Sequence, residues 1–169
     1  MRASAEPLDM PTLPQLYEED ITVLNRNLDQ LIRSTESSMA LIIDKGGFLI
    51  AHRGEAGSID TTSLAALAAG SFAATQTIAS IVNEPNFSSL YQQGEQCSLL
   101  VSDVDEFCLL GVVFRAGLSV GAVKYYAAGT IRSVATQLQI AVQRTPDGGL
   151  DLSLTNLADT SSVFQRRTA

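Results

Sequence analysis

Apolar residues recur at three- and four-residue steps in three stretches of the chain, and this spacing predicts three helices. The first helix is expected to begin at about residue 13 and to end near residue 33. The second is expected over residues 59–83, where the side chain of Asp60 is suited to cap the helix N-terminus. The third is expected over residues 131–145, because a Pro-Asp-Gly-Gly sequence follows it and stops a helix.

Shorter apolar runs between these helices predict five strands. Several are apolar at every position, which is typical of strands covered on both faces. Short turns rich in glycine and aspartate join neighbouring strands, so the pairing is expected to be antiparallel. We therefore expect an α/β (α+β) fold, a five-stranded antiparallel sheet with helices on both faces, in the order α-β-β-α-β-β-β-α. The expected strands are 39–43, 48–51, 97–101, 107–114 and 120–125.

The chain of 169 residues has the length of one domain with additional tails. Residues 1–12 contain two prolines and are expected to form a flexible arm, and residues 13–144 are expected to form the domain. Residues 145–169 are expected to form a flexible tail. Leucines spaced along this tail leave open a second interpretation, a short segment that becomes ordered on a partner.

Charge and composition exclude several classes of function. A formal net charge of −7 argues against binding to nucleic acid or to an anionic membrane, which needs clustered lysine and arginine. No uninterrupted apolar run reaches the length of a membrane span, and the first residues lack the apolar core of a signal peptide. We therefore expect a cytoplasmic protein without membrane insertion. The two cysteines, Cys97 and Cys108, lack metal-site spacing, so no metal is expected.

No catalytic motif stands out in the chain, and we expect neither a cofactor nor a catalytic residue of its own. His52 is the single histidine, and no serine or cysteine accompanies it at the spacing of a nucleophilic motif. Asp103 and Asp105 flank an expected hairpin tip, where aspartate usually serves turn formation. An enzyme that uses His52 or this aspartate pair stays as a distant alternative.

Helical spacing divides the central helix into two faces. One face is expected to face the core, and the other is small and uncharged. A solvated helix face normally carries charge, so the second face indicates either a helix buried on all sides in its own domain or contact with a partner. The expected core stripe is Leu64, Leu67, Ala68, Phe72, Ile78 and Val82, and the small face is Ala66, Ala69, Gly70, Ala73, Thr77 and Ser80.

Four segments carry a resemblance to a known family. The central helix opens with IDTTSLAALAAG over residues 59–70, and the first strand and turn read LIIDKGG over residues 41–47. Shorter pieces are YQQG at residues 91–94 and SVGAVK at residues 119–124. Together they resemble the roadblock family, in particular its bacterial MglB-like members, over about residues 15–143.

This resemblance implies a function. Such proteins are homodimers whose sheets join at their edges and whose central helices lie side by side, forming a platform for a Ras-like GTPase of the MglA type. The platform stimulates GTP hydrolysis by stabilising the GTPase's own catalytic residues, and it serves cell polarity or motility. Ala73 and Thr77 match the GTPase-contacting positions, and Thr77 departs from the glycine expected there. Ala66, Ala69, Gly70 and Ser80 join them as helical neighbours.

The resemblance leaves two hypotheses open for the role of this platform. The first is a regulator that activates the GTPase and has no enzymatic activity of its own. The second is a roadblock scaffold or adaptor, which binds a GTPase or another roadblock protein without changing hydrolysis. The same helix face would serve both.

Overall fold

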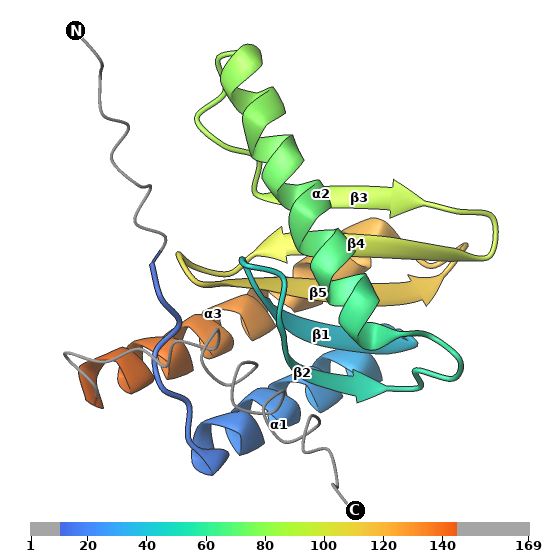
Figure 1. Ribbon diagram of the computed structural model, residues 1–169. Helices are drawn as coiled ribbons and strands as arrows, with labels where there is room; N and C mark the ends of the chain where they lie inside the picture. Colours follow the sequence, from blue (N-terminus) through green and yellow to red (C-terminus); the bar gives the residue numbers. More distant parts are fainter. Residues whose placement is uncertain (1–10, 145–169) are drawn as a thin grey trace, which may run out of the picture.

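Three helices and five strands follow one another in the predicted order in the computed structural model, which describes residues 11–144 (Figure 1). The predictions of a flexible arm over residues 1–12 and a flexible tail over residues 145–169 lie almost wholly outside the described residues. The elements are α1 (Glu18–Thr35), β1 (Met39–Asp44), β2 (Leu49–Gly54), α2 (Thr61–Ile81), β3 (Ser89–Gln93), β4 (Cys97–Asp103), β5 (Cys108–Arg115) and α3 (Val120–Arg144).

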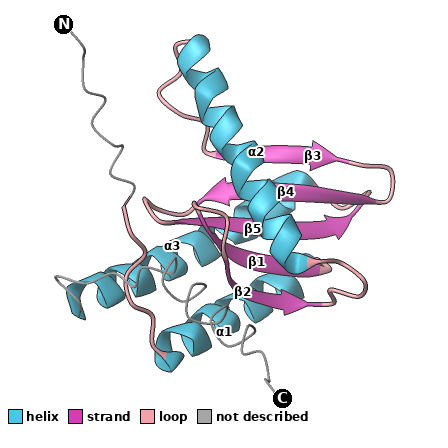
Figure 2. Ribbon diagram, viewed as in Figure 1, coloured by secondary structure: helices cyan, strands magenta, loops and turns pink. Residues whose placement is uncertain are grey.

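The five strands form one sheet in the order β2-β1-β5-β4-β3, and every neighbouring pair is antiparallel. Helix α2 crosses one face of this sheet, and α1 and α3 cover the other (Figures 1 and 2). Strands β1 and β5 are therefore buried along almost their whole length. The predicted fold class is confirmed, and so is the inference that continuous apolar runs mark doubly covered strands.

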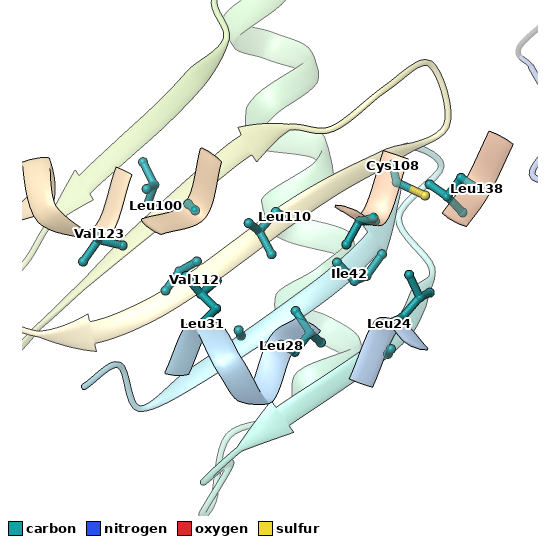
Figure 3. Close-up of a cluster of buried hydrophobic side chains, with 14 of the residues drawn as sticks. Leu24, Leu28, Leu31, Ile42, Leu100, Cys108, Leu110, Val112, Val123 and Leu138 are labelled. Atoms are coloured by element: carbon teal, nitrogen blue, oxygen red, sulfur yellow. The ribbon is translucent and has the colours of Figure 1, made fainter. Parts of the chain in front are cut away.

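Alternation of side chains along the strands builds two cores, one on each face of the sheet. Ile42, Leu110 and Val112 point towards α1 and α3, where Leu28 and Leu138 complete the packing (Figure 3). The intervening residues of the same strands point to the other face and pack against α2 through Met39, Leu41, Ile43, Leu109 and Val113.

One expected strand is wrong, and one strand of the sheet was not expected. Residues 120–125, expected as a strand, form the start of α3, and the fifth strand is instead β3. Ser119 explains the first difference, because its hydroxyl accepts a hydrogen bond from the Ala122 N–H at 3.3 Å and caps a helix. Strand β3 is short and half-buried at the edge of the sheet, so its sequence carries little apolar signal.

Helix α1 begins at Glu18, five residues later than expected, because Asp20 determines its first turn. The Asp20 carboxylate is fully buried and accepts hydrogen bonds from the Tyr17 N–H at 2.7 Å and from the Gln137 side chain at 2.6 Å. It also forms an ion pair with Arg144, whose guanidinium lies over the Tyr17 ring. This carboxylate therefore joins the N-terminus of α1 to the C-terminal half of α3.

Asp20→Asn is expected to lower the free energy of unfolding by about 2 kcal/mol at pH 7, because hydrogen bonds to a charged group are lost. Burial alone would raise the pKa of Asp20, but the Tyr17 N–H, Gln137 and Arg144 together hold the pKa below its usual value. A lowered folded-state pKa stabilises the protein above the unfolded pKa of about 3.9, and this contribution is lost as the pH falls through the folded value. Urea unfolding at several pH values should show a constant difference above about pH 5 that shrinks below about pH 4.

Candidate partner-binding site

Helix α2 begins as the sequence predicts. The Asp60 carboxylate accepts hydrogen bonds from the N–H groups of Thr62 and Ser63, each at 3.1 Å, and from the Ser63 hydroxyl at 2.5 Å. These bonds, the Ser63 hydroxyl first among them, hold the pKa of Asp60 below its usual value. The N-terminal half of the helix is thereby anchored beside the β1–β2 turn, where a side chain at Gly47 would meet the Ala66 backbone.

Small side chains bring α2 close to the sheet. Its buried residues are Ala65, Ala68, Ala69, Phe72 and Ala79. The expected core stripe is confirmed at Ala68 and Phe72 and at the partly buried Leu64, but it is wrong at the other three positions. Leu67 is 70% exposed, and Ile78 and Val82 are also exposed. Ile78 and Val82 belong to the C-terminal end of α2. In Figure 1 this end of the helix extends past β3, the edge strand of the sheet.

The face of α2 that points away from the sheet carries no charge, because the whole helix contains no acidic or basic residue. One expected member of this face needs correction: Ala69 is only 4% exposed and packs in the core, since it points towards the sheet. Leu67, Ile78 and Ile81 add apolar area to the face, and Ile81 is 74% exposed. The other expected members are all exposed: Ala66, Gly70, Ala73, Thr77 and Ser80.

Hydroxyl groups on this face are turned towards the helix itself. The Thr77 hydroxyl donates to the Ala73 carbonyl at 3.5 Å, and the Ser80 hydroxyl donates to the Gln76 carbonyl at 3.3 Å. Their hydrogen-bonding capacity is partly used within the helix, which makes the surface less polar than its composition suggests. The face is therefore suited to contact with another protein surface.

The C-terminal part of α2, which extends past β3 and is called the overhanging end below, is held by the segment that follows it. The Gln76 side chain donates to the Phe87 carbonyl at 2.7 Å and accepts from the Phe87 N–H at 3.3 Å. The chain then enters β3, which among residues 11–144 pairs only with β4, so that its other edge is open to the rest of that part of the chain. An apolar helix end and an open strand edge thus lie at the same side of the fold.

The alternative catalytic residues are placed apart from this face. His52 is exposed on the edge strand β2, opposite Leu41 of β1. Asp105 accepts hydrogen bonds from the N–H groups of Phe107 and Cys108, each at 2.9 Å, and Asp103 forms an ion pair with Lys45 at 2.8 Å. Burial raises the pKa of Asp105, and these backbone bonds oppose the rise. Asp105 therefore stabilises the β4–β5 turn, and Asp103 links the end of β4 to Lys45 in the β1–β2 turn.

Residues 11–144 also bear on two other kinds of site, metal centres and membrane spans. Within that part of the chain, no three histidine, cysteine, aspartate or glutamate side chains gather as a metal site requires. By length and composition alone, helix α2 could cross a membrane. This corrects the expectation that no stretch of the chain is long and apolar enough for a membrane span. Helix α2 has this composition because it carries apolar side chains on its exposed face and small alanine side chains where it packs against the sheet.

Gly70→Ala is expected to raise the free energy of unfolding by about 1 kcal/mol, because alanine favours a helix interior and an added Cβ meets no atom within 4 Å. Gly129→Ala is the matched control, since Gly129 lies inside α3 and an added Cβ there also has no neighbour within 4 Å. Urea unfolding at low protein concentration measures both. A loss of stability at Gly70 alone would contradict the prediction and would reveal a close neighbour at that position.

Comparisons with known proteins identify relatives with the same fold. The Roadblock/LC7 domain model matches residues 24–114. Among solved structures, Myxococcus xanthus MglB is 30% identical with a TM-score of 0.70, and the match covers 76% of this chain and 96% of that one. The gliding protein MglB from Thermus thermophilus is 30% identical with a TM-score of 0.70 and coverages of 76% and 98%. No curated protein sequence matches the chain.

A third structure, an MglB with tetrameric arrangement, is 29% identical. Its TM-score is 0.72, and the match covers 78% of this chain and 98% of that one. The similarity thus extends over nearly the whole length of the three MglB chains.

Proposed function

The chain belongs to the Roadblock/LC7 family as an MglB-like member, and we propose that it is a homodimeric, cytoplasmic regulator of a small Ras-like GTPase of the MglA type. In this proposal it binds the GTPase and stimulates GTP hydrolysis in cell polarity or motility. The observation that carries the proposal is the exposed, uncharged face of α2. The similarity to MglB over nearly the full length of those chains supports it.

The exposed side chains at the overhanging end of α2 favour a homodimer. Ile78 and Ile81 are 53% and 74% exposed, and the open edge of β3 lies nearby. A contact between two copies around a two-fold axis would remove this apolar area from water and would also cover both strand edges. Small residues such as Gly70 and Ala73 would let the two α2 helices, or a partner on top of them, approach closely.

The proposed mechanism requires no catalytic group from this chain. Helix α2 carries no arginine or lysine that could stabilise a developing charge on the phosphates from this face. Stimulation then comes from differential binding: the platform binds the hydrolysis-competent arrangement of the GTPase more tightly than the others and so raises its population. If the hydrolysis-competent state is sparsely populated, a gain of about 1.4 kcal/mol in this preference would raise its population roughly tenfold. The rate of GTP hydrolysis would rise by the same factor.

The test combines the full chain with the MglA-type GTPase from the same genome. Phosphate release under single-turnover conditions is expected to accelerate at least roughly tenfold, and to saturate at a ratio of two chains per GTPase. Binding measured in parallel by fluorescence separates the alternatives. Binding without acceleration would replace the activator by a scaffold, and the absence of both would overturn the proposal.

A further inference from the structure

A groove lies between α1 and α3, on the face of the sheet opposite to α2. Its volume is about 440 Å³, within the range of ligand-binding clefts. Helix α1 contributes Asn27, Gln30 and Ser34 to the lining, and α3 contributes Tyr125, Tyr126 and Arg132. Because the sheet separates this groove from α2, occupation of the α2 face leaves it open (Figure 1).

We propose that this groove is a second docking site, which binds an acidic amphipathic segment of a partner protein. The segment would place a carboxylate against Arg132 and an apolar side chain against Tyr125 and Tyr126. This site is independent of the proposed GTPase platform.

Charge is the first argument for an acidic occupant. Arg132 is the charged residue of the lining, and Arg26 and Arg33 share an exposed ridge of α1 with Gln30 at four- and three-residue steps. Within residues 11–144 the ion pairs are Lys45–Asp103, Arg53–Asp29 and Arg144–Asp20, so these three arginines have no carboxylate partner there. In a chain of net charge −7, an arginine in the lining without a carboxylate partner, and two more exposed on the adjoining helix, favour an anionic partner.

The aromatic side chains are the second argument. Tyr125 is 77% exposed and Tyr126 is 45% exposed, and their rings meet edge to face with 5.3 Å between centroids. Tyrosine and arginine are the residues most enriched at the energetic centres of protein interfaces. Gly129 also lines the groove, and a glycine inside a helix costs about 1 kcal/mol relative to alanine. The missing side chain there keeps space open between the tyrosines and α1.

Two other occupants fit the groove less well. A two-fold contact between copies would bring the arginines of one copy towards those of the other, which is unfavourable. The chain's own residues 145–169 contain three aspartates but also Arg166 and Arg167. With three aspartates and two arginines, this segment has a formal net charge of −1, so it offers the groove little negative charge.

The test uses a library of random 12-residue peptides displayed on phage, selected on the full chain. Enriched peptides are expected to combine two or more acidic residues with an apolar one. Synthetic copies should bind at least tenfold more weakly to Arg132→Glu and to Gly129→Leu, which fills the groove, and about equally to Arg115→Glu. Arg115 is a matched control, because it is also an exposed arginine but lies outside the groove. Higher salt should weaken the binding.

Each other outcome overturns the proposal. Peptides that bind Arg132→Glu as well as the wild type would place the site elsewhere. A tenfold gain in peptide affinity after Asp147, Asp151 and Asp159 are changed to asparagine would identify the chain's own tail as the occupant. A smaller oligomer in Arg132→Glu would identify a second copy. Stimulation of the GTPase should be unchanged in Arg132→Glu, so the two proposals fail separately.

Discussion

Arginine at both Ala73 and Thr77 is expected to abolish binding of the GTPase and its stimulation, while the domain stays folded. Both side chains lie on the exposed, uncharged face of α2 and point away from the sheet, so longer side chains extend into solvent in the free protein. In a complex, two guanidinium groups would lose their hydration against an uncharged surface. A buried unpaired charge costs several kcal/mol, which corresponds to a loss of affinity of at least roughly a hundredfold.

The matched control places arginine at Ala122 and Thr136 of α3. These are also an exposed alanine and an exposed threonine, and the Thr136 hydroxyl bonds to the carbonyl four residues earlier, as that of Thr77 does. Titration of the labelled GTPase and light scattering measure binding and oligomeric state. The prediction is an intact dimer without GTPase binding in the α2 variant, and wild-type behaviour in the control. GTPase binding that survives in the α2 variant would place the platform elsewhere, and a monomer would assign these positions to the self-contact.

The most buried strands were the easiest to predict from the sequence. Strands β1 and β5 lie between helices on both faces, so their residues are apolar without interruption and the pattern identifies them directly. Strand β3 is half-buried and bonded on one side only, so little in its five residues distinguishes it from a loop. The run of residues 120–125 satisfies a strand pattern, and only the cap at Ser119 and the later burial of Ala127 and Thr130 identify a helix.

The uncharged face of α2 was predictable in its character but not in all its members. The absence of charge from α2 is a property of the sequence, and five of the six small residues assigned to the face are exposed. The positions of Leu67, Ile78 and Ile81 are different, because an apolar residue fits a core and an interface equally well. Leu67 is exposed because it lies on the outer side of α2, next to Ala65, Ala68 and Ala69, which are packed on the sheet. The exposure of Ile78 and Ile81 depends on how far the sheet extends beneath the helix, which is a property of the assembled fold.

Gly54, the last residue of β2, should be among the positions least tolerant of a side chain. Its φ angle is +96°, and an added Cβ would lie 2.3 Å from the Ser38 carbonyl oxygen and 2.9 Å from the Met39 Cα. Gly54 pairs with Met39 in the sheet, and the Ser38 carbonyl accepts a hydrogen bond from the Glu55 N–H at 2.9 Å. Backbone atoms on both sides therefore fill the space that a side chain would need.

Gly54→Ala is expected to lower the free energy of unfolding by about 3 kcal/mol or more, because backbone strain and a backbone clash add to each other. Gly117→Ala separates the two causes: its φ is +95°, but an added Cβ meets no atom within 4 Å. This control should lose only about 1–2 kcal/mol, the cost of a left-handed backbone for alanine. Urea unfolding of both variants at one protein concentration measures the difference. Equal losses in the two variants would contradict the prediction. They would show that the backbone at Ser38 and Met39 moves aside, and that close packing at Gly54 adds no cost beyond that of the positive φ angle.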